Sequence, residues 1–251
     1  MAESGRGRFV WHELMTPDAK KAQEFYTKIT GWGTQPFGDA YTMWTVNGVP
    51  MGGVMNLPEP SAPIGWLAYI SVPDVQAAAN KVESLGGKIV KKPADIPNVG
   101  TFSIVADPQG AMFCLFKGAQ NQPFEDRDPK IGEFSWHELA TTDWAAAWKF
   151  YENLFGWEKR AEHDMGPMGV YMLFGIAGRE AGGMFTRPKE MPGGPAWLHY
   201  VRVPDSDRAA ALVQQYGGQV LNGPMDVPGG DRIAQCLDPQ GAAFAVHSRK
   251  A

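Results

Sequence analysis

Cysteine is scarce in this 251-residue sequence, which contains only Cys114 and Cys236. Two cysteines at unrelated positions are too few for a disulfide framework, so we expect a reducing, cytoplasmic environment. No segment approaches the ~20 consecutive apolar residues that cross a bilayer. The polar residues 1–8 also lack the apolar stretch of a signal peptide. The sequence therefore predicts a protein that depends on neither a membrane nor disulfide bonds.

Clustered positive charge is missing as well. The formal net charge is −4, and the 23 Lys and Arg residues form no basic stripe, which argues against an electrostatic nucleic-acid binder. Phosphate loops, dinucleotide fingerprints, CxxC pairs and a Ser/His/Asp order are absent too. The expected partner is therefore a small molecule, and a homodimer stays open.

What the sequence does contain is a long internal duplication. Trp11-His12-Glu13-Leu14 returns 125 positions later as Trp136-His137-Glu138-Leu139. The shift is 130 at the Gly52-Gly53 pair and 131 from Trp66 onward. A period of this length exceeds that of solenoid repeats, so each copy is the size of a domain. We predict copy one at residues 7–118, a linker at 119–131 and copy two at 132–248.

Each copy reads as a strand, a helix and three short strands, followed by the same order again. In the first such βαβββ module, Asp18 is a candidate N-cap, and the helix over residues 19–29 is expected to end at Gly31. Single helices alternate with antiparallel strand runs, which favours an α+β fold over a doubly wound parallel sheet.

These patterns resemble the vicinal oxygen chelate superfamily, which includes glyoxalase I, bleomycin-resistance proteins, fosfomycin-resistance enzymes and extradiol dioxygenases. The likeness is greatest to tandem glyoxalase-like proteins. It implies two vicinal-oxygen-chelate-like domains, each of paired βαβββ modules forming a cup-shaped, mostly antiparallel sheet with a divalent metal on its concave face. The features that carry the resemblance are Asp18, Phe25-Tyr26, Gly31-Trp32, Gly86-Gly87 and the Asp107-Pro-Gln-Gly110 turn.

The family's metal-ligand positions lack suitable donors here. Carried over one by one, these positions hold Trp11, Trp136, Leu67, Leu198, Cys114 and Ala245, and the fourth position falls within 54–56 and 184–186, where no His or Glu occurs. The usual metal site is therefore expected to be missing, and no cofactor is predicted. A divalent metal remains an alternative through His12, His137 and His247, although the first two are expected to face the helices.

The repeated strand offers a different chemistry. Side chains alternate along a strand, so Trp11 and Glu13 share a face, as do Trp136 and Glu138. A carboxylate beside an indole in a concave site is a candidate general acid/base, so Glu13 and Glu138 are the expected catalytic residues. A purely structural role for them is the alternative. The expected ligand-binding residues are Trp11, Trp44, Tyr69, Cys114, Phe116, Trp136, Tyr171, Tyr200 and His247. The Gly52-Gly53 and Gly182-Gly183 pairs are interpreted as bends in the sheet.

The preferred hypothesis is a small-molecule-binding glyoxalase-like protein, which could be an enzyme acting on a metabolite or xenobiotic. One alternative is a metal-dependent lyase or dioxygenase with a non-standard site. Another is a protein that sequesters a drug or toxin.

Overall fold

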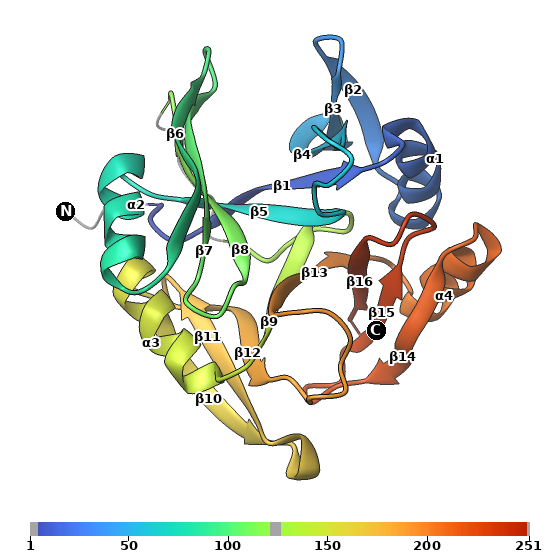
Figure 1. Ribbon diagram of the computed structural model, residues 1–251. Helices are drawn as coiled ribbons and strands as arrows, with labels where there is room; N and C mark the ends of the chain where they lie inside the picture. The colour runs from blue at the N-terminus through green and yellow to red at the C-terminus, as the bar shows by residue number, and fades with distance from the viewer. Residues whose placement is uncertain (1–4, 121–126, 250–251) are drawn as a thin grey trace. The chain divides into compact units, whose positions relative to one another are not determined.

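The computed structural model describes residues 5–120 and 127–249, so residues 121–126 of the expected linker lie outside the described residues. The described chain contains the four expected βαβββ modules (Figure 1). The two modules of copy one comprise β1 (Phe9–Thr16), α1 (Ala19–Thr30), β2 (Gly33–Phe37), β3 (Tyr41–Val46) and β4 (Val49–Asn56), then β5 (Gly65–Ser71), α2 (Val75–Ser84), β6 (Lys88–Ile96), β7 (Gly100–Ala106) and β8 (Met112–Gly118).

Copy two repeats this order. Its modules comprise β9 (Phe134–Thr141), α3 (Trp144–Phe155), β10 (Glu158–Asp164), β11 (Val170–Ile176) and β12 (Arg179–Thr186), then β13 (Ala196–Arg202), α4 (Ser206–Gln215), β14 (Gln219–Asp226), β15 (Arg232–Leu237) and β16 (Ala243–Ser248). A short 3₁₀ helix (Gly166–Met168) occupies the insertion between β10 and β11. No helix in the described ranges is long and apolar enough to span a membrane.

The strands form two eight-stranded mixed sheets. Their orders are β2-β3-β4-β1-β5-β8-β7-β6 and β10-β11-β12-β9-β13-β16-β15-β14. Within a module the hairpins are antiparallel, while the first and last strands pair in parallel, as β1 does with β4 and β13 with β16. These features confirm the predicted α+β fold class.

The helix boundaries follow the signals read from the sequence. Asp18 accepts hydrogen bonds from the backbone N–H groups of Lys20 and Lys21, and α1 ends at Gly31, whose φ of 74° places it in the left-handed region. Asp143 and Gly156 do the same for α3. The N-cap oxygen satisfies N–H groups that have no partner within the helix, which fixes where each helix begins.

The compact units of the fold do not coincide with the sequence copies. Unit 1 draws its described residues from 5–10, 68–120 and 137–197, and unit 2 draws them from 11–67, 127–136 and 198–249. Each unit therefore combines one module of copy one with one module of copy two. In unit 1 the helices α2 and α3 lie side by side over a shared core, and in unit 2 α1 and α4 do so (Figure 1).

A buried chain of hydrogen bonds joins the two modules of unit 2. Tyr26 on α1 donates its hydroxyl to Asp238 Oδ2 at 3.2 Å and accepts the indole N–H of Trp66 at 3.1 Å. Asp238 opens the Asp-Pro-Gln-Gly turn of copy two, and its Oδ1 also accepts the backbone N–H groups of Gln240 and Ala242. Burial raises the pKa of Asp238 above its usual value, as expected for a carboxyl moved out of water.

The glutamine of the same turn reaches the start of the neighbouring helix. Gln240 accepts the backbone N–H of Asp18 at 2.8 Å and donates to the carbonyl of Asp18 at 2.9 Å. Unit 1 repeats the whole arrangement with Tyr151, Asp107, Trp197 and Gln109. The repeated turn therefore does more than reverse the chain, because it fastens a module of one copy to a module of the other.

We expect Tyr26→Phe to destabilise the protein by about 1–3 kcal/mol, since it leaves a carboxylate oxygen and an indole N–H buried without their shared partner. The free energy of unfolding in urea measures the loss. Tyr216→Phe, at a residue 40% exposed, is the matched control and should change little. Equal stability of the two variants would contradict a role for the buried hydroxyl.

Candidate functional site

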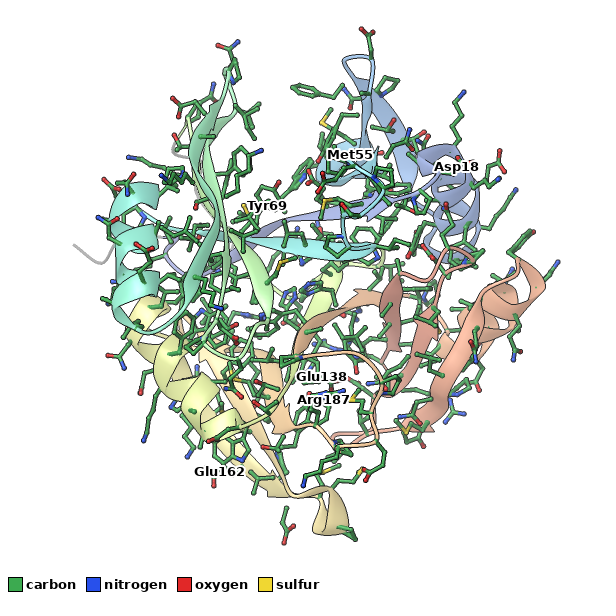
Figure 2. All side chains as sticks on the ribbon, viewed as in Figure 1. Asp18, Met55, Tyr69, Glu138, Glu162 and Arg187 are labelled. Atoms are coloured by element: carbon green, nitrogen blue, oxygen red, sulfur yellow. The ribbon has the colours of Figure 1, made fainter. Side chains whose placement is uncertain are left out.

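The repeated first strand shows the expected alternation of burial on β1, whereas His137, Glu138 and Leu139 are all buried on β9. On β1, His12, Leu14 and Thr16 are buried, while Trp11 and Glu13 are partly exposed. On β9, Glu138 is 8% exposed and belongs to unit 1. Glu138 is labelled in Figure 2, together with Tyr69 of β5.

Glu13 takes part in a directed hydrogen-bond chain in unit 2. The indole N–H of Trp11 donates to the hydroxyl of Tyr41 at 2.9 Å, and Tyr41 also hydrogen-bonds Glu13. An indole can only donate and a carboxylate can only accept, so the Tyr41 proton points to Glu13. Burial, together with the negative charge of Glu13, raises the pKa of Tyr41 well above its usual value. The phenol therefore stays protonated and holds the carboxylate in place.

The same pair recurs in unit 1. Tyr171 on β11 donates its hydroxyl to Glu138 Oε2 at 2.9 Å. Tyr171 was expected in the site from the sequence, whereas Tyr41 was missed. The shift of 130 that relates the glycine pairs also relates these two tyrosines, and this signal could have found Tyr41.

The second glycine of each pair makes room for an aromatic ring. Gly53 lies opposite Glu13 in the strand register, and a Cβ on Gly53 would come within 2.0 Å of the Tyr41 hydroxyl oxygen. Gly183 lies opposite Glu138, and its Cβ would come within 2.2 Å of the Tyr171 ring. The missing side chain lets each phenol approach the strand closely and reach the carboxylate.

Trp44 does not belong to this surface. Its side chain is fully buried in the helix-side core of unit 2, where it packs near the rings of Tyr26 and Trp32. The expectation that Trp44 lines a ligand site is therefore wrong. The register irregularity opposite Trp44 lies on β4, where Met51 is the extra residue. On β3, Trp44 lies three positions after Tyr41, so simple alternation already places the two side chains on opposite faces.

Unit 1 carries an aromatic cluster on its other module. Tyr69 lies 6.4 Å from Phe102 and 5.9 Å from Phe116 between ring centroids, and the ammonium group of Lys91 lies 4.7 Å from the centre of Phe102. Phe102 was not predicted. Cys114 is fully buried, as is common for a cysteine that packs as a small apolar residue.

Unit 2 is more polar at the equivalent positions. Trp136 packs against Tyr200, Ile233 and Ala245, and Gln235 donates its amide to the Tyr200 hydroxyl at 2.8 Å. These contacts bring together Trp136 and Tyr200, two residues that the sequence placed in the ligand site.

His247 lies beside the cluster of Trp136 and Tyr200, and both of its ring nitrogens form hydrogen bonds. Its Nδ1 lies 2.8 Å from Ser135 Oγ and its Nε2 lies 2.8 Å from Asp231 Oδ2. With both nitrogens occupied, His247 does not fit the role of a metal ligand. This Ser-His-Asp arrangement was not predicted, because its members follow none of the familiar sequence spacings.

The other expected histidines are interior residues. In unit 2 the His12 ring stacks on Phe134 with 3.7 Å between centroids, and His199 lies edge-on to His12 at 4.8 Å. In unit 1 His137 stacks on Phe9 at 3.6 Å. These placements agree with the helix-facing orientation expected from the strand alternation.

The metal positions implied by the resemblance do not fit a metal. Trp11, Trp136, Leu67 and Leu198 have no lone pair to offer a divalent cation, and the thiol of Cys114 lies 3.4 Å from the carbonyl of Leu115. The imidazoles of His12 and His199 are the groups in unit 2 that could supply nitrogen ligands. Burial lowers the pKa of His199 to about 3, so its ring is neutral, which is the form that binds metals.

A family model and two named relatives match most of the chain. A sequence model described as the Glyoxalase/Bleomycin resistance protein/Dioxygenase superfamily matches residues 8–115 and 131–246. CFP32 of Mycobacterium tuberculosis, whose name describes it provisionally as a glyoxylase, is 34% identical over 255 residues, covering 98% of this chain and 96% of CFP32. The anthracycline biosynthesis protein DauV of Streptomyces sp. strain C5 is 29% identical over 267 residues, covering 98% of this chain and 94% of DauV.

Solved structures share the fold at low sequence identity. A Mn(II)-bound glyoxalase from Novosphingobium aromaticivorans has a TM-score of 0.67 at 15% identity, covering 98% of this chain and 83% of that one. The 2,3-dioxygenase LapB from Pseudomonas sp. KL28 has a TM-score of 0.70 at 12% identity, covering 100% of this chain and 94% of that one. These likenesses confirm the fold class predicted from the sequence.

We expect Gly53→Ala to displace Tyr41 and break its hydrogen bonds to Trp11 and Glu13. The added methyl group overlaps the phenol, at a typical overpacking cost of about 1–3 kcal/mol. Tryptophan fluorescence and urea unfolding report the change. Gly194→Ala is the control, because a Cβ there meets nothing within 4 Å. A Gly53→Ala protein with native fluorescence and stability would show that Tyr41 is not seated on Gly53.

Proposed function

Because the chain belongs to the Glyoxalase/Bleomycin resistance protein/Dioxygenase superfamily, we propose that it binds a small molecule of apolar or mixed polarity through the strands that carry Glu13 and Glu138. The observation that carries this proposal is the repeated glutamate–tyrosine pair seated on a glycine. Glu13 is hydrogen-bonded to Tyr41 in unit 2, and Glu138 is hydrogen-bonded to Tyr171 in unit 1. In both pairs the tyrosine packs against a glycine. A carboxylate held in this way is suited to accept or donate a proton at a bound ligand.

The neighbouring aromatic groups support an apolar ligand. Tyr69, Phe102 and Phe116 form a cluster in unit 1, and Trp136 and Tyr200 pack together in unit 2. Aromatic surfaces with a few polar groups are typical of small-molecule sites. The name of DauV suggests an anthracycline as the first ligand to test, and the name of CFP32 suggests a glyoxalase-type substrate as the second.

The acid/base role of Glu13 is tested by Glu13→Gln, which keeps the shape but removes the charge. For an enzyme we expect turnover to fall by ~10²–10⁴-fold with little change in affinity. Anthracycline binding is followed by tryptophan fluorescence and product formation by mass spectrometry, with Glu138→Gln as the matched variant of copy two. A change in affinity alone, with no product formed by the wild type, would favour the sequestering alternative.

The binding role of the indoles is tested separately. Trp11→Ala and Trp136→Ala should each weaken binding by ~10–100-fold, since each removes an aromatic contact worth about 1–3 kcal/mol. The same fluorescence titration supplies the affinities, and Glu13→Gln measured alongside separates loss of the ring from loss of charge. Unchanged affinity in both alanine variants would place the ligand elsewhere on the protein.

Metal-dependent chemistry is a second candidate, favoured by the neighbouring imidazoles of His12 and His199 in unit 2, of which His199 is kept neutral by burial. These two imidazoles would hold the metal, which would act as a Lewis acid when bound. Our preferred function does not use it, so we expect ligand binding to survive dialysis against EDTA. Metal analysis of protein purified without added metal provides the check. Stoichiometric metal in the wild type that disappears in His199→Gln, together with loss of binding after EDTA, would support the second candidate instead.

A further inference from the structure

Three side chains of unit 2 form a hydrogen-bonded row that the proposed function does not use. His247 near the end of β16 bridges Ser135 of β9 and Asp231, which directly precedes β15, and both bonds are 2.8 Å long. The His247 side chain is 13% exposed and that of Asp231 is 34% exposed, and Ser135 is also partly exposed. The row is therefore ordered by its contacts and still open to a ligand.

The bonding pattern is satisfied in both protonation states of His247. In the neutral ring, Nε2–H donates to the Asp231 carboxylate, so Nδ1 accepts the hydroxyl proton of Ser135. In the charged ring, Nδ1–H donates to Ser135 Oγ. The hydroxyl can then turn to the carbonyl of Tyr200, which lies 3.3 Å away. His247 can thus gain or lose a proton while Ser135 and Asp231 keep their hydrogen-bond partners, which is the property that a proton relay needs.

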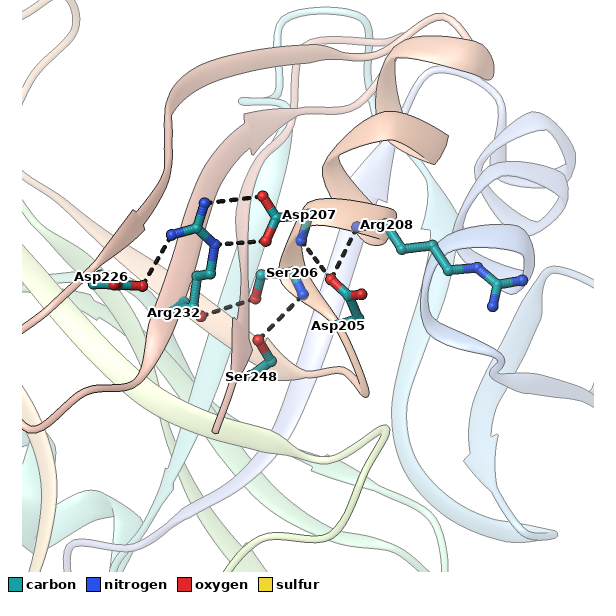
Figure 3. A network of polar contacts seen from close by, with 7 residues as sticks. All are labelled: Asp205, Ser206, Asp207, Arg208, Asp226, Arg232 and Ser248. Atoms are coloured by element: carbon teal, nitrogen blue, oxygen red, sulfur yellow. Dashed lines mark hydrogen bonds and ion pairs between the residues drawn. The ribbon is translucent and has the colours of Figure 1, made fainter. Parts of the chain in front are cut away.

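A network of polar contacts holds the residues that follow Asp231 and His247 in the sequence (Figure 3). Arg232, the residue after Asp231, donates to both carboxylate oxygens of Asp207 and to Asp226. Ser206 donates its hydroxyl to the carbonyl of Arg232, and its backbone N–H donates to Ser248, the residue after His247. The start of β15 and the end of β16 are therefore tied to the first turn of α4, which keeps Asp231 and His247 in register.

The row exists in copy two only. The equivalent positions of copy one hold Val10, Gly100 and Phe116, so all three polar groups are replaced together. At Gly100 an added Cβ would lie 2.2 Å from the carbonyl oxygen of Lys117 and 3.0 Å from the Phe116 ring, so the position that carries Asp231 in copy two has no room for a side chain in copy one. A hydrogen-bonded row needed only to close the strands would be equally useful in both copies.

The other charged side chains around His247 bind partners other than the imidazole. Arg232 is held by Asp207 and Asp226, and Arg249 pairs with Asp128. Arg202, opposite His247 in the parallel register, donates to the carbonyl of Pro129, and Glu133 pairs with Arg127. Asp231 is therefore the carboxylate that acts directly on the imidazole.

We propose that Ser135, His247 and Asp231 form a proton relay that ionises the acidic hydroxyl of a ligand bound at copy two. The ligand O–H bond breaks as its proton passes to Ser135 Oγ, while the Ser135 proton passes to His247 Nδ1. The ligand is left as an oxyanion, and the imidazolium is stabilised by Asp231. The adjacent Trp136 and Tyr200 rings suit an aromatic ligand carrying such a hydroxyl. This inference rests on the proposed function, because it takes Trp136 and Tyr200 of unit 2 as part of the binding surface.

The test uses 4-nitrophenol, whose absorption changes when its hydroxyl ionises, with the full-length protein. We expect the bound probe to ionise at a pH lower by about one unit or more than the free probe, since the imidazolium favours the oxyanion. Ser135→Ala should abolish this shift while leaving His247 and Asp231 in place. His247→Phe, which installs the residue found in copy one, should abolish it too. His163→Phe, at an exposed strand position, is the control and should keep the shift.

A direct view of His247 by ¹⁵N NMR of histidine-labelled protein completes the experiment. We expect the neutral ring to carry its proton on Nε2 and to charge reversibly at Nδ1 in the folded protein. The opposite tautomer, a probe that does not bind, or a shift that survives in Ser135→Ala would each overturn the relay. The proposed function is judged independently, by the response of anthracycline binding to Trp11→Ala and Glu13→Gln, so the two can fail separately.

Discussion

A buried tyrosine hydroxyl shared by an aspartate and a tryptophan holds each unit of this protein together. Tyr26 joins Asp238 and Trp66 in unit 2, and Tyr151 does the same in unit 1. In both units the helix comes from one sequence copy and the turn from the other. Desolvation makes such a group costly unless every bond is made, so the pairing of modules between copies is specified by polar contacts as well as by the apolar core.

This exchange of modules decides which chemical groups share a unit. Unit 1 combines the Glu138–Tyr171 pair of copy two with the Tyr69, Phe102 and Phe116 cluster of copy one. Unit 2 combines the Trp11–Tyr41–Glu13 chain of copy one with the polar row at His247. Both units therefore keep one glutamate–tyrosine pair, but they differ in the polarity of their second module.

Much of this structure was predictable from the sequence because local chemistry decides it. Asp18 and Gly31 bound a helix through capping, and the alternation along β1 separates Glu13 from His12. The pairing of modules was not predictable, since the two alternatives bury the same residues and differ only in which copy supplies the partner. The contact made by the second glycine of each pair was missed for a similar reason. A glycine without a positive φ signals close approach by another group, and only the structure identifies that group as Tyr41 or Tyr171.

The glutamate–tyrosine pair occurs in both copies, whereas the polar row occurs in copy two only, and this difference bears on function. Both copies contain the pair together with the glycine that the phenol contacts, so the pair has a role common to both copies. The row has no polar member in copy one, where the equivalent positions hold Val10, Gly100 and Phe116. A structural constraint shared by two similarly folded modules would leave similar residues in both. The joint replacement of Ser135, Asp231 and His247 is better explained by a ligand group that copy two meets and copy one does not.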